Sequence, residues 1–397
     1  MYTKHIDKIV SLFESFLNSK GVDDIDISDV REALDKLTYR ESIPDAHGEV
    51  AYVDHYTSNP ADIIVGSLPS PKNVTETQVL IEVHAAALNP IDYKRAEGMI
   101  SLMYPEEFPL RLGYDVAGVV TKVGIKVERF KEGDRVYGRL SYNHAGSIGE
   151  VVVAEESVLA HIPESVSFTV AAAVPLAGMT AKQALEWAGL ESDQSLFVNG
   201  GMGGVGMFAV ALAKHYFGVK EITTTVSAGK IKLVKQMGAT KVVDYQKESY
   251  TDVLENTADV VFDTVGDSET YRVAKQNSSA VSVALLPDGN ALDQFRHDSA
   301  PLSMFGKAKL AAAKVIVAGA GWYLTRGFRL KNIRYGYVVM SPDGCDLEKT
   351  FNPLLENKTI KPIISNVYPF TTDGVQSAFK ELMAGHVAGK IIIHVKD

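Results

Sequence analysis

The sequence contains a single cysteine, Cys345, among its 397 residues. One cysteine cannot form a disulfide within the chain, so a fold held together by intramolecular disulfides is excluded. It also excludes any zinc site that takes two or more thiolates from this chain, including the four-cysteine structural type. This sparing use of cysteine indicates a reducing compartment.

Long apolar and long basic runs are absent as well. The longest apolar stretch, 315–324, has about half of the roughly 20 residues that a transmembrane helix needs. The formal net charge is −9 and the pI is near 5.6, which argues against nucleic acid as a partner. The first residues also lack an apolar signal region followed by a small-residue cleavage site. We therefore expect a cytoplasmic protein, with an organelle as the alternative if a leader has been removed.

The pattern of apolar residues changes along the chain and predicts several parts. Residues 1–45 have apolar side chains at helical spacing and are predicted to form a helical extension. Residues 48–165 contain β-branched runs separated by glycine, which predict a barrel-like β domain. From about residue 167 helices and strands alternate, beginning with a predicted helix over 169–189. This alternation predicts a parallel sheet with helices on both faces.

A glycine-rich turn, 199–206, follows a predicted strand and opens a predicted helix. Its glycines have the spacing G-x-G-x-x-G, which lets the backbone turn tightly and approach a pyrophosphate at a helix N-terminus. The alternative is a turn whose glycines only allow close packing of the helix on the strand. We predict dinucleotide binding by the residues of the motif, namely Gly201, Gly203, Gly204, Val205 and Gly206.

The end of the next predicted strand indicates which dinucleotide is bound. An NAD site usually places a carboxylate there to hold the ribose hydroxyls. This strand is followed instead by Ser227 and Lys230, which suit a 2′-phosphate, and Tyr245 after the following strand is another candidate donor. We therefore favour NADPH over NADH. The alternative for Lys230 is an ordinary solvated lysine at a helix start.

Several sequence motifs follow one another in a fixed order over about 48–397. They are NPIDYKRAEG (89–98), GYDVAGVVTKVG (113–124), AAAVPLAGMTA (171–181), GGMGGVG (200–206), YGYVVMSPDG (335–344) and GHVAGKIIIHV (385–395). This ordered series resembles the zinc-free branch of the medium-chain dehydrogenase/reductase superfamily, the quinone oxidoreductase group. Within that group the chain looks most like the plant enone and alkenal double-bond reductases, and the segment 335–344 resembles the reticulon-4-interacting protein group.

The resemblance implies an α/β fold with two lobes, and it implies that the protein forms a homodimer. A GroES-like β-barrel domain would comprise 46–166 and 343–397, and a Rossmann-type domain with a parallel sheet would comprise 167–342. The segment 332–339 would pair across the two-fold axis of a homodimer. The extension 1–45 matches no part of the family pattern.

The zinc alcohol dehydrogenases of the same superfamily differ from this chain at a metal ligand. Their G-H-E motif supplies a histidine to catalytic zinc, whereas this sequence has Gly113-Tyr114-Asp115. His84, His144 and His161 lack ligand spacing and are interpreted as packed or surface residues. The resemblance thus implies a reductase that works without zinc and has no metal site.

Without a metal, a protein side chain must stabilise the negative charge that hydride transfer leaves on a conjugated oxygen. By resemblance, Lys94 faces the substrate carbonyl, Asn89 lies at the cleft edge and Thr180 approaches the nicotinamide. Asp92 either orients Lys94 or caps a helix start. The alternatives are a surface lysine for Lys94, a turn residue for Asn89 and a helix residue bonded to backbone for Thr180.

We thus predict an NADPH-dependent reductase of quinones or α,β-unsaturated carbonyls. The alternative is a non-catalytic NADPH-binding scaffold or sensor that docks a partner through residues 1–45. The apolar stretch 299–329, punctuated by basic residues, predicts helices that cover the cofactor domain near the cleft. Its alternative is peripheral contact with a membrane.

Overall fold

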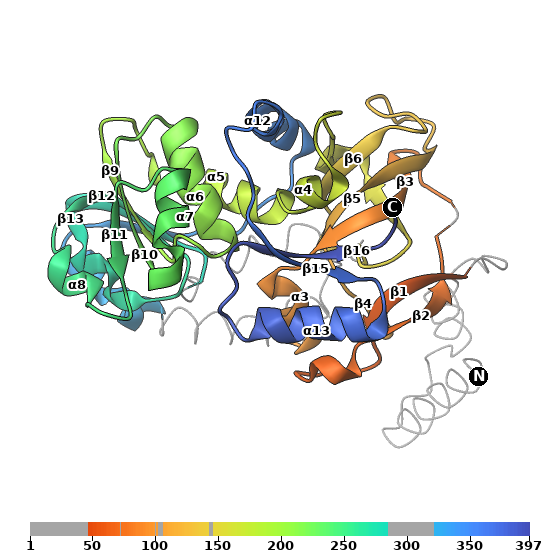
Figure 1. Ribbon diagram of the computed structural model, residues 1–397, viewed down its shortest axis with the longest axis horizontal. Coiled ribbons are helices and arrows are strands. Elements are labelled where there is room, and N and C mark those ends of the chain that lie inside the picture. The colour runs from red at the N-terminus through yellow and green to blue at the C-terminus, as the bar shows by residue number, and fades with distance from the viewer. Residues whose placement is uncertain (1–46, 72, 100, 102–105, 143–145, 285–320) are drawn as a thin grey trace, which may run out of the picture. The chain divides into compact units, whose positions relative to one another are not determined.

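The computed structural model describes residues 47–397 except 72, 100, 102–105, 143–145 and 285–320 (Figure 1). All of these belong to one compact unit, His47–Asp397. The predicted extension 1–45 and most of the stretch 299–329 lie outside the described residues.

A seven-stranded sheet confirms the β lobe. Its strand order is β15-β16-β3-β5-β6-β8, with β7 paired to β3. All pairs are antiparallel except β15 with β16. The strands are β3 (Gln78–Ala87), β5 (Asp115–Val123), β6 (Arg135–Arg139), β7 (Val151–Glu155), β8 (Leu159–His161), β15 (Ile364–Pro369) and β16 (Lys390–His394).

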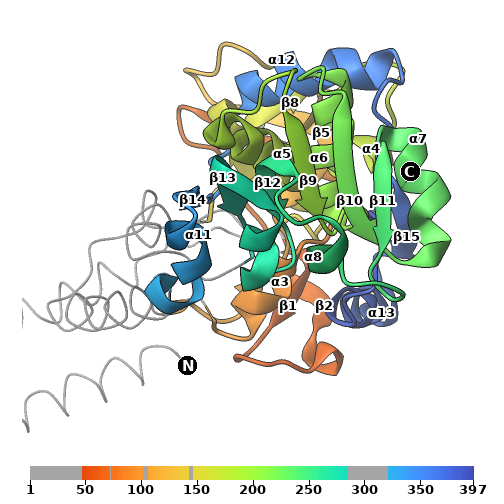
Figure 2. The same ribbon diagram turned by 90° about the vertical axis from the view of Figure 1, so that its left-hand side faces the viewer.

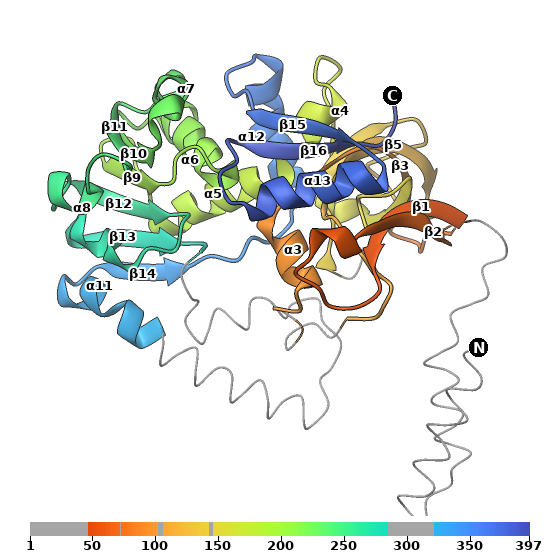
Figure 3. The ribbon, with the colours of Figure 1, turned by 60° about the horizontal axis from the view of Figure 1, so that its bottom comes forward.

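A smaller three-stranded sheet, which the sequence did not predict, has the order β2-β1-β4. Its strands are β1 (His47–Val53), β2 (Ile64–Pro69) and β4 (Leu110–Arg111). The short helices of this lobe are η1 (Pro60–Asp62), α3 (Pro90–Ala96), η3 (Glu156–Val158) and α4 (Phe168–Ala172). The long helix α13 (Thr372–Met383) lies beside β15 and β16 (Figure 3).

The predicted parallel sheet is also confirmed, with six strands in the order β11-β10-β9-β12-β13-β14 (Figure 2). Every neighbouring pair is parallel. The strands are β9 (Ser195–Asn199), β10 (Glu221–Val226), β11 (Lys241–Asp244), β12 (Ala258–Asp263), β13 (Ala274–Ser282) and β14 (Arg334–Tyr337). Its helices are α5 (Pro175–Ala188), α6 (Gly204–His215), η4 (Ala228–Lys230), α7 (Ile231–Met237), α8 (Tyr250–Val253), η5 (Ser268–Arg272) and α11 (Arg326–Leu330).

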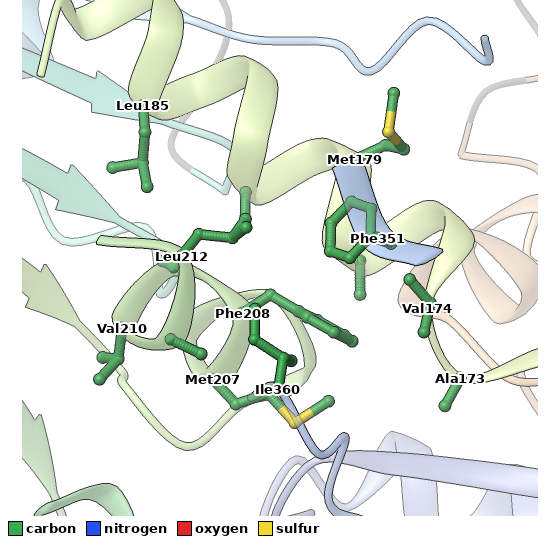
Figure 4. Packing of buried hydrophobic residues seen from close by; sticks show 14 of the residues in the cluster. Ala173, Val174, Met179, Leu185, Met207, Phe208, Val210, Leu212, Phe351 and Ile360 are labelled. Atoms are coloured by element: carbon green, nitrogen blue, oxygen red, sulfur yellow. The ribbon is translucent and has the colours of Figure 1, made fainter. Parts of the chain in front are cut away.

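Helices cover both faces of this sheet because its central strands are apolar on both sides. In β9, Leu196 and Val198 face the core formed with α5 and α6, while Phe197 packs in a different core with Phe328 of α11. Alternating side chains of one strand point to opposite faces, so each strand supplies both cores. The first of these cores extends to α12 (Gly344–Glu356), where Phe351 meets Phe208 of α6 edge-on, with ring centroids 5.9 Å apart (Figure 4).

The prediction of one continuous helix over 169–189 was wrong, because two helices occupy this range. Helix α4 ends at Ala172, and α5 begins at Pro175. Proline has no N–H group and a fixed φ, so it suits the first position of a new helix and interrupts a continuing one.

The strands of the β lobe come from 47–161 and 364–394, and those of the parallel sheet from 195–337. The exact domain boundaries at 166 and 343 stay a prediction. Among the residues that the structure describes, no helix is long and apolar enough to cross a bilayer.

Candidate active site

The glycine-rich turn joins β9 to α6, as the sequence predicted. Gly203 is the N-cap of α6, in extended conformation and without a side-chain cap. The N–H groups of the first helical turn have no partner inside a helix, and they carry the positive end of the helix dipole. They are therefore available to an anion such as a pyrophosphate.

The glycines of the motif serve different purposes. A Cβ on Gly206 would overlap the carbonyl oxygen of Gly200, and one on Gly201 would overlap Thr224 of β10. A Cβ on Gly203 would have its nearest neighbour, the Gly200 oxygen, at 3.6 Å. Close packing thus accounts for Gly201 and Gly206, while the space beside Gly203 and the uncapped helix fit a dinucleotide phosphate.

The residues predicted to select the dinucleotide lie at the same edge of the sheet. Strands β10 and β11 are parallel neighbours with Val226 opposite Asp244, so Ser227 and Tyr245 follow the two strands at the same level. Tyr245 is 52% exposed, and the ammonium of Lys230 donates to the carbonyl oxygen of His386 at 3.1 Å. No carboxylate occupies the position of Ser227.

Three buried side chains form what we call the junction triad: Asn89, Asp115 and Lys390. The Asn89 amide nitrogen donates to Asp115 Oδ2 at 2.8 Å, and Lys390 Nζ donates to Asn89 Oδ1. The ammonium of Lys390 also donates to the Leu88 carbonyl oxygen at 2.8 Å and lies 3.3 Å from Asp115 Oδ2. Burial raises the pKa of Asp115 and lowers the pKa of Lys390, and the opposite charge of each partner counteracts the shift of the other.

The junction triad connects the glycine-rich turn to the β lobe. The N–H of Gly389, just before Lys390, donates to the Met202 carbonyl oxygen at 2.9 Å. On the other side, the backbone N–H of Leu176 in α5 donates to Asp115 Oδ1 at 2.9 Å. Residues from the β3–α3 connection, β5, α5 and β16 thus meet beside the glycine-rich turn.

Asp92 caps the start of α3, one of the two alternatives for this residue. Its Oδ2 accepts the backbone N–H of Asn89 at 2.7 Å, which fixes the residue that enters the junction triad. Its Oδ1 is buried without a hydrogen-bond partner. Burial raises the pKa of Asp92 to about 7.

Lys94 and Thr180 have different surroundings. The side chain of Lys94, on α3, is half-buried and has no ion-pair partner among the described residues. The hydroxyl of Thr180 donates to the Leu176 carbonyl oxygen at 2.6 Å, which is the backbone bond of its alternative reading. Contact of either residue with substrate or nicotinamide stays a prediction.

Sequence reasoning missed two members of the junction triad. Asp115 and Lys390 stand in the motifs GYDVAGVV and GHVAGKIIIHV, but no local pattern shows that residues 275 positions apart form an ion pair. It also missed Arg139, which is 3% exposed at the end of β6 and stacks on the ring of Tyr114. In the described part of the chain, no three His, Cys, Asp or Glu side chains gather as a metal site would require.

A parallel sheet with a glycine-rich turn, joined to a β lobe through a buried polar junction, is the architecture of two-lobed oxidoreductases that bind a dinucleotide. Comparison with known proteins agrees. Residues 75–164 match the family model of the alcohol dehydrogenase GroES-like domain, and residues 204–306 match the zinc-binding dehydrogenase model.

Two curated relatives and one solved structure are similar over most of the chain. The 2-methylene-furan-3-one reductase of Solanum lycopersicum is 37% identical over 81% of this chain and 73% of its own. The chloroplastic NADPH-dependent alkenal/one oxidoreductase of Arabidopsis thaliana is 34% identical over the same shares. The quinone oxidoreductase structure from Coxiella burnetii has a TM-score of 0.74 and 27% identity, over 88% of this chain and all of the other.

This chain therefore belongs to the medium-chain dehydrogenase/reductase superfamily, within its quinone oxidoreductase group. The family consists of oxidoreductases with a GroES-like domain and a Rossmann-type domain, as the sequence predicted.

Proposed function

We propose that the protein is an NADPH-dependent, zinc-independent reductase of quinones or of the C=C bond of α,β-unsaturated carbonyls. The observation that carries the proposal is the uncapped start of α6, with open space at Gly203 and with Ser227 and Lys230 in place of a ribose-binding carboxylate. An ammonium and a hydroxyl favour a 2′-phosphate, whereas a carboxylate would repel it. The bound dinucleotide would supply a hydride.

The side chains near the junction triad support reduction without a metal. Zinc relatives use a histidine where this chain has Tyr114, whose buried phenol is a poor ligand because burial raises its pKa. An acceptor activated by its own conjugation needs only a hydrogen-bond donor for its oxygen. Lys94 is the proposed donor, because its ammonium has no ion-pair partner among the described residues and its charge would oppose that of an enolate.

Several finer points are part of the proposal. The acceptor is a small apolar quinone or unsaturated carbonyl, in keeping with the names of the two plant relatives. Strand β14 is an edge strand of the described sheet and is the proposed dimer contact. Membrane contact and a cytoplasmic location stay predictions. The alternative of a non-catalytic scaffold rests on residues 1–45, which lie outside the described part.

The direct test is to mix the purified full chain with NADPH or NADH and a panel of quinones, enones and alkenals. We expect oxidation of NADPH in preference to NADH, and Lys94→Ala should lower turnover while leaving NADPH affinity unchanged. Absence of oxidation with every acceptor would refute the proposal and favour the scaffold.

Variants of the glycine turn separate cofactor binding from folding. Gly203→Asp should weaken NADPH binding at least tenfold, because its carboxylate would face the phosphates. Gly203→Ala is the matched control, since its Cβ meets no atom closer than 3.6 Å. If a titration gave equal NADPH affinity for the two variants, the phosphates of NADPH would not bind at this turn.

A further inference from the structure

Within the residues that the structure describes, several buried hydrogen-bonding atoms without partners gather around Tyr114. The atoms are the Tyr114 hydroxyl, Nε and Nη1 of Arg139, Oγ of Ser147 and, on neighbouring α3, Oδ1 of Asp92. Buried polar groups are normally paired, and leaving one unpaired lowers stability. A concentration of such groups in one place therefore suggests that a hydrogen-bonding partner arrives there during function.

Three of these residues form what we call the open cluster: Tyr114, Arg139 and Ser147. The guanidinium carbon of Arg139 lies 4.9 Å from the centroid of the Tyr114 ring and 4.3 Å from that of Tyr142. The backbone N–H of Ser147 donates to the carbonyl oxygen of Gly113, directly before Tyr114, at 3.3 Å. Tyr114, Arg139 and Ser147 are 0%, 3% and 0% exposed.

Arg139 differs from Arg95, a neighbouring arginine that is partly buried. The Arg95 guanidinium binds both carboxylate oxygens of Glu106, with Nη2 to Oε2 at 2.6 Å. No carboxylate of the described residues forms an ion pair with Arg139, although Arg139 is only 3% exposed and the Arg95 side chain is 11% exposed. The face of a tyrosine ring attracts the positive charge of a guanidinium. Unlike a carboxylate, however, the ring face does not accept hydrogen bonds from the N–H groups at the edge of the guanidinium. Arg139 is thus a buried positive charge whose Nε and Nη1 donors form no hydrogen bond within the described residues.

The open cluster lies beside the junction triad and near the carboxyl end of the parallel sheet. Tyr114 directly precedes Asp115, and β6 pairs with β5 so that Arg139 is opposite Asp115. The junction triad reaches the turn after β9 through the N–H of Gly389, which donates to the Met202 carbonyl oxygen at 2.9 Å. Ligands of open parallel sheets bind outside the carboxyl ends of the strands.

We propose that Arg139 and Tyr114 bind the carbonyl oxygen of the acceptor, as an oxyanion-binding pair. The proposal rests on the proposed function and adds a donor to the one assigned to Lys94. When a hydride adds to the β-carbon of an enone, the electron pair of the C=C bond shifts to give an enolate with its negative charge on oxygen. The guanidinium and the tyrosine hydroxyl donate to that oxygen. A proton from water then adds to the α-carbon, and the carbonyl forms again.

The experiment compares wild type, Arg139→Gln, Arg139→Lys and Tyr114→Phe in steady-state reduction of methyl vinyl ketone, acrolein and benzoquinone. We expect Arg139→Gln to lower kcat/KM at least a hundredfold for acceptors, with NADPH affinity unchanged. Arg139→Lys keeps the charge and should lose less, and Tyr114→Phe should lose about tenfold because one neutral hydrogen bond, about 1 kcal/mol, is removed.

Arg135→Gln is the matched control. Arg135 lies on the same strand, but its guanidinium donates to carbonyl oxygens of Pro163, Glu164 and Val166. Its replacement removes the same charge without altering the open cluster and should leave kcat/KM within threefold of wild type. Circular dichroism of each variant shows whether it is folded.

A binding measurement tests the same site without turnover. Nitrophenol, whose phenolate carries a conjugated oxyanion, is titrated into the full chain with NADP⁺ present, and the shift of its absorption is followed. Wild type should bind it at least tenfold more tightly than Arg139→Gln. Equal phenolate binding, or equal kcat/KM in wild type and folded Arg139→Gln, overturns the inference while leaving the proposed function intact. Failure of wild type to oxidise NADPH with any acceptor refutes the proposed function, and the phenolate titration then still decides the oxyanion site.

Discussion

The junction triad and the open cluster are both buried, both charged and adjacent in the fold, yet their hydrogen bonding is opposite. In the triad, Lys390 donates to Leu88 and Asn89 and lies against Asp115, which also accepts from Leu176. In the open cluster, Tyr114, Arg139 and Ser147 have buried side-chain atoms with no hydrogen-bond partner in the described part of the chain. The two sets are adjacent in sequence as well, because Tyr114 of the open cluster directly precedes Asp115 of the junction triad.

This difference separates groups that hold the fold from groups kept for a ligand. A buried charge that is paired is partly compensated for the loss of water, and removing one partner of the pair is costly. A buried charge that is unpaired lowers stability, so its retention indicates a role outside folding. Removing members of the two sets should therefore change stability in different ways.

The largest expected effect is in the triad. Lys390→Met leaves the Asp115 carboxylate buried without its cation and should lower the free energy of unfolding by about 3–5 kcal/mol. Lys390→Met combined with Asp115→Asn should be less destabilised than the sum of the two single variants, because neither charge then remains. Urea denaturation of all four proteins gives the coupling energy. Additive losses would show that Lys390 and Asp115 do not act as a pair.

Asp92 belongs to neither set but accepts a hydrogen bond from the backbone of Asn89 in the triad, and its pH dependence follows from its raised pKa. The folded pKa is about 7 and the unfolded value 3.8, so the folded protein holds a proton that the unfolded chain has released between these values. Asp92 therefore lowers the free energy of unfolding progressively as the pH rises from about 4 to about 7.

Asp92→Asn keeps an oxygen for the Asn89 N–H but cannot ionise. Its stability relative to wild type should rise between pH 5 and pH 8, measured by urea denaturation at both pH values. A constant difference would mean that Asp92 ionises normally in the folded protein.

The smallest effect distinguishes two buried serines. The hydroxyl of Ser147 has no partner, so Ser147→Ala should change the free energy of unfolding by less than about 0.5 kcal/mol. The hydroxyl of Ser282 donates to buried Asp263 Oδ2 at 2.9 Å, and Ser282→Ala should cost about 1–3 kcal/mol. Thermal unfolding measures the stability of both variants. An equal loss of stability in Ser147→Ala and Ser282→Ala would contradict the expectation that only the hydrogen-bonded hydroxyl stabilises the fold.

Local patterns predicted the parallel sheet and the glycine-rich turn, because each depends on neighbours in sequence. The roles of Asn89, Ser227 and Lys230 stay predictions. The break before Pro175 could also have been read from the proline itself. The junction triad and the open cluster could not be predicted from the sequence, because each joins residues from distant parts of the chain. Neither the partner of Lys390 nor the lack of one at Arg139 has a signature in sequence spacing.

The most direct test compares Arg139→Met with Lys390→Met in both stability and turnover. Arg139→Met removes an unpaired buried charge, so its free energy of unfolding should stay within about 1 kcal/mol of wild type or rise, while kcat/KM for methyl vinyl ketone falls at least a hundredfold. Lys390→Met should lose about 3–5 kcal/mol of stability. If Arg139→Met were as destabilised as Lys390→Met and kept wild-type kcat/KM, the contrast between the two regions would be contradicted.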